Sequence, residues 1–310
     1  MAIYDCFCFF NEIDILEARL RLLDEKIDFF VIAEAEYTHS GKVKGFTLES
    51  FRERLDPWWR KIVYIKVKDK GIPQDTWYLE NVQRNRILEG INPDDDDIIL
   101  ISDIDEIPFP SKIPQKLPHG KVICFLQNNR YYFFDCAVEG NLIWEGGTKA
   151  LSFLTIKDDL LSDRGVRYND FSFKENLNKG VTLTKVRLFR HLSYIFDGGY
   201  HLGWMGGVEA ISKKVGATSH QEINTDSRRD VNDIKRNLKN HIDPLTGKNI
   251  FHIEPYGHRD LSLMRLLPAS FSSSGMLNKP SSRLYVRIRY RYELLVIILR
   301  NFLRRSFDRT

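Results

Sequence analysis

Two aspartates directly after a short apolar segment are the residues in this sequence best suited to bind a cation. Residues 98–101 are all Ile or Leu, and Asp103 and Asp105 follow, with Ser102 and Ile104 beside them. Such a run between acidic residues indicates a buried strand of a parallel sheet. If the backbone stays extended, both carboxylates point to one side and can hold Mg²⁺ or Mn²⁺. Because open α/β sheets bind ligands beyond the carboxyl ends of their strands, we expect a metal–diphosphate site here.

The same pattern also has a purely structural interpretation. Asp-rich loops after strands often cap a turn or the helix that follows, and an Asp-x-Asp motif alone does not separate the two interpretations. The apolar strand before the pair, and Glu106 and the rigid Pro108 after it, favour the functional interpretation.

The segments around this strand predict an α/β fold. Strands are expected over residues 3–10, 29–33, 62–67, 98–101 and 122–126, and helices over 14–26, 51–60 and 77–90. Strands that alternate with helices imply right-handed crossovers and a mainly parallel sheet. Further on, residues 196–214 combine five glycines with aromatic and charged residues. That composition suits a backbone that approaches a ligand closely, and a helix is expected to leave this loop at 208–215.

The C-terminal region differs in composition from the rest of the chain. Residues 269–282 are rich in Ser and also contain Gly and Pro, and are expected to form a linker. Residues 283–310 contain eight arginines against Glu293 and Asp308, around an apolar core at 294–299. As a helix this segment would be basic and amphipathic, and we expect it to lie on an anionic membrane. The alternatives are that it packs on its own domain or binds a partner.

The composition indicates a folded protein in a reducing compartment. Of 310 residues, 43% are hydrophobic, which is ample for a core, and the length allows one large domain or two smaller ones. The four cysteines show no CxxC or zinc spacing and are expected to be thiols.

A strand from Ile3 leaves no room for a signal peptide, and no apolar stretch reaches the ~20 residues of a transmembrane helix. We therefore expect a cytoplasmic protein, peripheral on the cytoplasmic face of a membrane where the C-terminal helix binds it. Nucleic acid is not an expected partner, because the basic residues gather in one terminal segment without a matching motif.

Several motifs occur together in a consistent order over residues 3–260. They are YDCFCFFNEIDILEARL (4–20), THSGKVK (38–44), QRN (83–85), SDIDEIP (102–108) and GGYHLGWMGG (198–207), followed by Ser219 and His220. In this combination the sequence resembles glycosyltransferase family 17, the family of the β-1,4-mannosyl-glycoprotein β-1,4-N-acetylglucosaminyltransferases. The Arg-rich tail lies outside the resemblance.

The resemblance implies a GT-A-like fold, with residues 1–127 as the nucleotide-sugar-binding half and 128–268 as the acceptor-binding half. It implies a nucleotide-sugar donor, UDP-N-acetylglucosamine (UDP-GlcNAc), transfer with inversion, and metal-binding positions at Asp103 and Asp105. Eukaryotic members carry an N-terminal membrane anchor and stem that this sequence lacks. We therefore expect a glycan or a lipid-linked or surface polysaccharide as the acceptor, in place of a Golgi glycoprotein.

A cation held by Asp103 and Asp105 would neutralise the charge that develops on the β-phosphate of the departing UDP. A third protein ligand is expected from His201 or His220, and we favour His201 because glycines surround it. Either histidine can instead be an ordinary surface or core residue.

Inversion requires a general base that accepts the proton of the acceptor hydroxyl. The candidates are, in order, Glu209 at the start of the helix after the glycines, Asp197 before them, and Glu145 in a Trp-Glu-Gly-Gly motif. The structural alternatives are that Asp197 caps a turn and that Glu209 interacts with the helix dipole.

Further donor-binding residues are expected at the ends of the early elements. Asn11 and Glu12 end the first strand, where uracil or ribose would bind in a Rossmann-like half. Arg84 can meet phosphate or the two aspartates, or it can pair with Glu80 one turn earlier. Lys149 can neutralise the diphosphate.

Two other classes of protein compete with this interpretation. A haloacid-dehalogenase-like phosphatase also places Asp-x-Asp after a strand, but a small hydroxylated or β-branched residue normally follows, and here Glu106 and Ile107 follow. A non-catalytic carbohydrate- or membrane-binding protein would explain the basic tail and the aromatic residues. Among these, Trp144 and Trp204 can stack on sugars or simply pack in the core. That class does not explain an acidic pair at a strand end.

Overall fold

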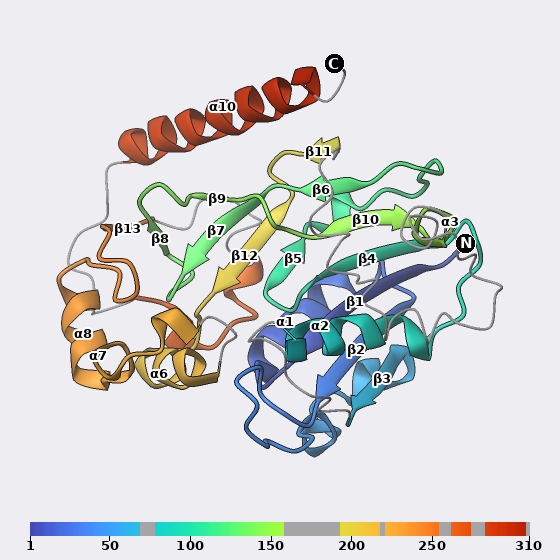
Figure 1. The fold of residues 1–310 in the computed structure, drawn as a ribbon, viewed down its shortest axis with the longest axis horizontal. Helices are drawn as coiled ribbons and strands as arrows, with labels where there is room; N and C mark the ends of the chain where they lie inside the picture. The colour runs from blue at the N-terminus through green and yellow to red at the C-terminus, as the bar shows by residue number, and fades with distance from the viewer. Residues whose placement is uncertain (69–77, 158–192, 218–220, 254–261, 274–282, 308–310) are drawn as a thin grey trace.

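A seven-stranded sheet forms the centre of the computed structural model, which describes residues 1–68, 78–157, 193–217, 221–253, 262–273 and 283–307 (Figure 1). In spatial order its strands are β11 (Ser193–Ile195), β6 (Ile123–Phe125), β10 (Lys149–Ser152), β4 (Ile98–Asp103), β1 (Ile3–Phe9), β2 (Phe29–Ala35) and β3 (Ile62–Val67). The pairs β4–β1, β1–β2, β2–β3 and β11–β6 are parallel, whereas β10 is antiparallel to both of its neighbours. The prediction of a mainly parallel α/β sheet is confirmed.

The other elements of the described residues are two small sheets and the helices. One sheet has the order β5 (Glu106–Pro108), β12 (Gly199–Gly203), β7 (Gln127–Tyr131) and β9 (Ile143–Trp144), and the other pairs β8 (Cys136–Val138) with β13 (Ile250–His252). The α-helices are α1 (Ile13–Leu23), α2 (Tyr78–Asn85), α3 (Phe153–Thr155), α6 (Val208–Ala217), α7 (Asp226–Arg229), α8 (Val231–Lys239) and α10 (Arg283–Phe307). The 3₁₀ helices are η1 (Leu48–Phe51), η2 (Asp56–Lys61), η3 (Arg86–Gly90), η4 (Pro110–Lys112), η6 (Gln221–Ile223) and η7 (Ala269–Phe271).

Helices cover both faces of the large sheet, which explains why its central strands are apolar along their length. On one face, Leu16 of α1 packs in a core cluster with Phe7 of β1. On the other face, Ile87 and Leu88 of η3 belong to a second cluster with Ile101 of β4. Side chains alternate across each strand, so every strand of the centre contributes to both cores.

The order of the strands places a topological switch point between β1 and β4. From β1 the chain proceeds through α1 to β2 and β3 on one side, and α2 then brings it back to β4 on the other side of β1. The direction of winding therefore changes between β1 and β4. Ligands of open α/β sheets bind at such a switch point, outside the carboxyl ends of the two strands. Here those ends are Phe9 and Asp103.

Two observations bear on the expected boundaries. Residue 127 does not divide the large sheet from the rest, because β10 and β11 come from later in the chain and complete that sheet. The expected linker at 269–282 begins with packed residues: Phe271 lies in the main core, and the Ser273 hydroxyl donates to Asp135 at 2.7 Å. The serine-rich composition concealed this apolar anchor. Residues 274–282 lie outside the described ranges.

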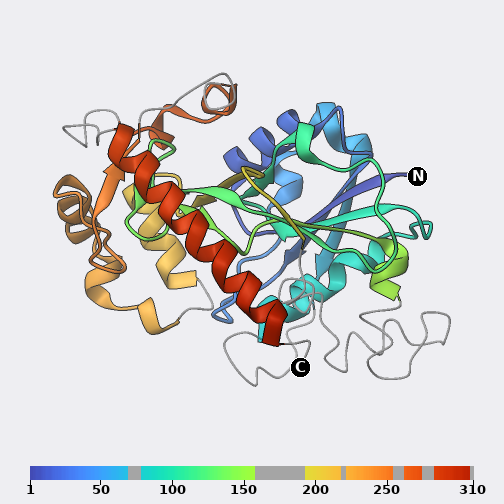
Figure 2. The same ribbon diagram turned by 90° about the horizontal axis from the view of Figure 1, so that it is seen from above.

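The C-terminal helix α10 lies along the outside of the molecule (Figures 1 and 2). Tyr290, Leu294 and Ile297 pack with Leu126 and Ile143 of the domain. No helix in the described part of the chain has an apolar stretch long enough to cross a membrane. All four cysteines fall in the described ranges and are thiols rather than halves of disulfides, as expected.

Candidate functional site

Asp103 and Asp105 lie on the link between the large sheet and the four-stranded sheet. β4 ends at Asp103, β5 begins at Glu106, and Ile104 and Asp105 form a turn between them. The expectation of extended backbone through Asp105 was therefore wrong. The physical reason is that β4 and β5 belong to different sheets, so the chain must change direction between them.

A fully buried arginine holds this turn from beneath. Arg19 Nη1 donates to the carbonyl oxygens of Asp103, Ile104 and Glu106, each at 3.0 Å. The same guanidinium pairs with the buried Asp5 carboxylate at 2.6 and 2.8 Å. Because buried charges persist only when they are paired and hydrogen-bonded, this network fixes both the arginine and the turn.

Sequence analysis missed Arg19, although a signal was present. It lies three residues after Leu16 and four before Leu23, on the buried stripe of α1. A charged residue in such a stripe needs a partner, and Asp5 is the acidic residue within the apolar strand β1.

The Asp103 side chain is held by Arg84 of α2. Arg84 Nη2 lies 2.7 Å from Asp103 Oδ1, and Nη1 lies 2.9 Å from Glu80 Oε1. The two interpretations considered for Arg84, a contact with the aspartates and a pair within its helix, are therefore both realised. The neighbouring Gln83 donates to the carbonyl oxygens of Phe9 and Ala33 at 3.1 and 2.8 Å, which ties α2 to the ends of β1 and β2.

Asp105 and Glu12 meet at the ammonium group of Lys214, which comes from α6. Lys214 Nζ lies 3.3 Å from Asp105 Oδ2 and 3.8 Å from Glu12 Oε1. Burial lowers the pKa of Lys214, but the Asp105 and Glu12 carboxylates outweigh burial and hold the pKa above its ordinary value. The side chain is therefore an ammonium ion at neutral pH and links α6 to the carboxyl ends of β1 and β4. Lys214 was not singled out from the sequence.

His201 stands beside Asp105 in a row of three strands. On β12 it is in register with Glu106 of β5 and Asn129 of β7. Its Nε2 lies 3.8 Å from Asp105 Oδ1, and the ring stacks on Trp144 with centroids 4.3 Å apart. One face of Trp144 is thus covered by His201, and its indole N–H donates to Glu106 at 2.7 Å.

The protonation state of His201 follows from its neighbours. Burial lowers the pKa of His201 more than the carboxylates of Asp105 and Glu106 raise it, so the imidazole is neutral at neutral pH. Its Nδ1 lies 2.7 Å from Asn129 Oδ1, and an amide oxygen only accepts. With the Asn129 amide in this orientation the proton is on Nδ1 and the lone pair is on Nε2, the nitrogen nearer Asp105.

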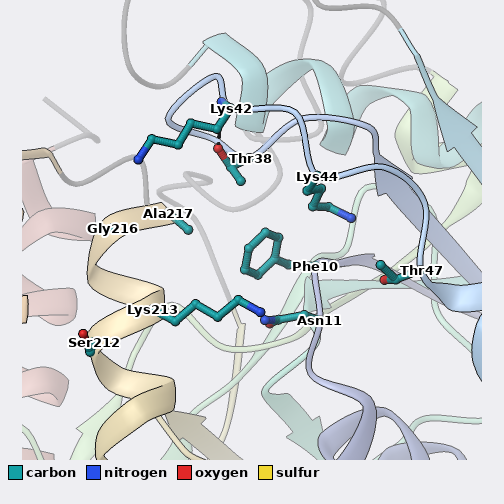
Figure 3. A pocket seen from close by; sticks show the side chains of 10 residues that line it. All are labelled: Phe10, Asn11, Thr38, Lys42, Lys44, Thr47, Ser212, Lys213, Gly216 and Ala217. Atoms are coloured by element: carbon teal, nitrogen blue, oxygen red, sulfur yellow. Dashed lines mark hydrogen bonds between the residues drawn. The ribbon is translucent and has the colours of Figure 1, made fainter. Parts of the chain in front are cut away.

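A pocket of about 330 Å³ opens next to these residues (Figure 3). Phe10 and Asn11 line it from the end of β1, and Figure 3 shows α6 on the opposite side, with Lys213 extending towards Asn11. The other lining residues are Thr38, Lys42, Lys44, Thr47, Ser212, Gly216 and Ala217. Lys44 is paired with Glu34 at 2.6 Å. No described carboxylate pairs with Lys42 or Lys213, so the pocket has a surplus of positive charge and suits an anion.

Several candidates from the sequence lie elsewhere. Lys149 is fully buried, and its ammonium donates to the carbonyl oxygens of Gly146 and Gly147 at 2.6 and 2.9 Å, not into the pocket. Glu145 pairs with Arg300 of α10. Asp197 is exposed in the turn before β12 and accepts from Asn128 at 2.8 Å. His220 is outside the described residues.

Glu209 is exposed in the first turn of α6. It precedes Ser212 by three residues, Lys213 by four and Gly216 by seven, which is the spacing of one helix face. Glu209 therefore extends the face of α6 that lines the pocket. Asp197 and Glu209 lie beyond opposite ends of β12, so they do not belong to one centre.

The glycine-rich stretch serves the fold as much as a ligand. A Cβ on Gly199 would lie 2.1 Å from the carbonyl oxygen of Ile107, and one on Gly198 would lie 2.8 Å from the Phe125 Cβ. These two glycines allow β12 to lie close to its neighbours, so the expected close approach is to protein backbone. Gly206 and Gly207 have φ values of +107° and +86° and let the chain turn into α6.

The donor groups were tested for a divalent cation. Within the described ranges, no three or more His, Cys, Asp or Glu side chains are grouped so that they could hold a metal by themselves. Asp103 and Asp105 are hard oxygen ligands of the kind that Mg²⁺ and Mn²⁺ take, and the His201 lone pair lies nearby. The chemical types of Asp103, Asp105 and His201 therefore suit a divalent cation that takes its remaining ligands from substrate oxygens and water.

Comparison with protein-family models identifies a family for the N-terminal part of the chain. Residues 1–153 match the family model described as Glycosyltransferase family 17. The matched range contains the Asp103–Asp105 turn, Arg19 and Arg84, whereas β12 and α6 lie beyond it. No curated protein matches the chain.

Proposed function

By its residues 1–153 this chain belongs to glycosyltransferase family 17, and from this membership we propose that it transfers N-acetylglucosamine from UDP-GlcNAc. The acceptor is a hydroxyl group of a glycan or of a lipid-linked or surface polysaccharide, and the anomeric configuration inverts. Glycosyl transfer itself follows from the family, which favours it over the phosphatase and the non-catalytic binding protein.

One observation supports a nucleotide-sugar donor more than any other. The Asp103–Asp105 turn lies at the switch point of the sheet, beside a pocket lined by Lys42 and Lys213. A diphosphate needs cations, and the pocket volume of about 330 Å³ is within the range of small-molecule sites. The Phe10 ring in the same pocket offers an aromatic face for a base.

In this proposal Asp103 and Asp105 would hold Mn²⁺ or Mg²⁺, and His201 Nε2 would be a third protein ligand. The cation would supply Lewis-acid stabilisation of the leaving diphosphate. Arg84 orients Asp103 through the hydrogen bond of 2.7 Å, and Asn129 holds the His201 ring through its Nδ1. Lys214 adds a positive charge at Asp105 and Glu12.

We assign the general base to Glu209 ahead of Asp197. Glu209 lies on the face of α6 that lines the pocket, whereas Asp197 lies beyond the far end of β12. A base must come within hydrogen-bond reach of the acceptor hydroxyl, and Glu209 is an exposed carboxylate one helical turn before the lining residues Ser212 and Lys213. Asn11, at the end of β1, completes the donor side of the pocket.

A donor screen tests this function. The protein is incubated with Mn²⁺ and a panel of nucleotide sugars, and the released nucleotide is measured with an extract of glycans and glycolipids as acceptors. We expect UDP-GlcNAc to give the fastest release and Asp103→Asn and Asp105→Asn to lose at least about 100-fold, as for removal of an electrostatic contact to a transition state. Asp96→Asn, an exposed acid before β4, is the matched control. Full turnover by both turn variants would refute the site, and a faster release from another donor would refute UDP-GlcNAc.

A further inference from the structure

The helix α10 has two apolar faces, and the domain covers one of them. On the inner face, Tyr290, Leu294 and Ile297 join core clusters with the edge of the domain. Both views of the fold show the opposite side of α10 turned away from the sheets along its length (Figures 1 and 2).

The outward side carries a continuous apolar stripe. We call it the outer stripe; it consists of Leu284, Ile288, Tyr292, Leu295 and Leu299, which are between 52% and 68% exposed. Their spacing of three and four residues places them on one helix face. Val296 and Ile298 widen it and are 42% and 45% exposed, whereas the Tyr285 ring contacts Phe251 of the domain, with ring centroids 5.5 Å apart. Single exposed apolar residues are ordinary, but a contiguous apolar face indicates a contact with another phase or molecule.

The charges of the helix flank this stripe and have one sign. Arg287 and Arg291 are exposed on one border, and Arg289 and Arg300 lie on the other, where they pair with Glu139 and Glu145 of the domain. Within the described part of α10 the one acidic residue is Glu293. Its carboxylate faces inward and accepts the backbone N–H of Leu142 at 2.8 Å.

We propose that the outer stripe binds the surface of an anionic membrane. The helix then lies in the plane of the interface, with its Leu and Ile side chains at the acyl boundary and Tyr292 at the level of the headgroups. Arg287 and Arg291 extend from the border of the stripe to the lipid phosphates. This goes beyond glycosyl transfer and holds whichever sugar donor the protein uses.

A second copy of the chain would fit the outer stripe less well than an anionic membrane does. Tyr285, Ile288, Tyr292, Leu295 and Leu299 have the alternating spacing of a coiled-coil seam. Pairing two such helices brings arginines of one towards arginines of the other, and over Arg283–Phe307 the acid of α10, Glu293, binds the domain instead. Anionic headgroups carry the charge that attracts arginine.

Co-sedimentation of the full-length protein with vesicles tests the proposal. We expect binding to vesicles of phosphatidylcholine with phosphatidylglycerol, little binding to phosphatidylcholine alone, and release by high salt, which screens the attraction. Ile288→Glu should weaken binding more than tenfold. Val231→Glu, the same change at an exposed apolar helix residue elsewhere, should bind like the wild type. Arg287→Gln with Arg291→Gln should weaken binding about thirtyfold, from a contribution of about 1 kcal/mol for each arginine near an anionic surface.

Other outcomes overturn the proposal. The proposal is wrong if the wild type stays in the supernatant with anionic vesicles, or if Ile288→Glu and the double arginine variant bind as Val231→Glu does. Sedimentation equilibrium gives the remaining outcome: a wild-type dimer that Ile288→Glu dissociates would identify a second copy of the chain as the occupant of the outer stripe.

Discussion

Arg19 connects the buried core to the two aspartates of the candidate site. Its guanidinium binds three carbonyl oxygens of the turn and the Asp5 carboxylate while it is fully excluded from water. The backbone positions of Asp103 and Asp105 therefore depend on a residue that does not reach the pocket. Arg19 is a positioning residue in this account.

A conservative change at Arg19 should impair turnover more than folding. Arg19→Lys keeps the charge for Asp5 but loses the planar fork that spans the turn, and a misplacement of about 1 Å can cost ~100-fold in rate. We expect that loss in kcat/KM, measured by nucleotide release well below the unfolding temperature of the variant. Arg21→Lys, 53% exposed on the same helix, is the control. Equal kcat/KM values for the two variants would show that Arg19 has no positioning role.

The surplus of positive charge in the pocket leads to a second prediction for a single residue. Lys213→Ala should raise the dissociation constant for UDP about tenfold or more, because a hydrogen bond to a charged group contributes about 1.5–3 kcal/mol. Isothermal titration calorimetry measures the constant directly. Lys235→Ala removes an exposed lysine from α8 and should leave it unchanged. A Lys213→Ala variant that binds UDP like the wild type would place the diphosphate elsewhere.

At the scale of elements, a buried carboxylate fastens the loop that carries Lys42 and Lys44. Glu34 at the end of β2 accepts from Lys44, Tyr64 and the backbone N–H groups of Thr47 and Leu48. Burial raises the pKa of Glu34, but these hydrogen bonds outweigh it and hold the pKa below its ordinary value. The ionised form is therefore the one that the fold stabilises.

This arrangement predicts a dependence of stability on pH. Because the folded-state pKa lies below the unfolded value of ~4.3, the Glu34 contribution is complete above pH ~4.3 and is lost as the pH falls from there through the folded-state pKa. Glu34→Gln should lower the free energy of unfolding at pH 7 by about 2–4 kcal/mol, since it leaves buried donors unsatisfied. The difference in unfolding free energy between the variant and the wild type should narrow as the pH falls below ~4. Urea unfolding at several pH values measures it, with the exposed Glu53→Gln as control. A difference that stays constant with pH would contradict the role of the ionised carboxylate.

The strands differ in how far they could be predicted from the sequence. The apolar runs of β1, β2 and β4 predicted a parallel sheet, because both faces of these strands are buried. The antiparallel position of β10 in the sheet could not be predicted from its sequence, because Lys149–Ser152 pairs with strands that are distant in the chain. The turn at Ile104 and Asp105 was missed for the same reason: nothing local shows that β5 joins another sheet.

At the scale of the whole molecule, the candidate site is formed where the helix α6 packs against the carboxyl-end edge of the large sheet. The sheet supplies Asp103, Asp105 and the end of β1, and α6 supplies Lys213 and Lys214 from more than 100 residues later in the chain. Sequence analysis found the aspartates because they follow an apolar strand directly. It could not find the lysines, because their role depends on how α6 packs across the pocket. Arg19 and Asn129 were missed because they act on the candidate site indirectly. Arg19 positions the Asp103–Asp105 turn, and Asn129 positions His201.

The structure of the protein crystallised with UDP and Mn²⁺ tests the central claim most directly. We expect the diphosphate between the Asp103–Asp105 turn and α6, with Lys213 within hydrogen-bond distance of a phosphate oxygen and the metal bridging the aspartates and the diphosphate. Nucleotide density in another part of the molecule, with Asp103 still bound to Arg84 and Asp105 still bound to Lys214, would contradict the account.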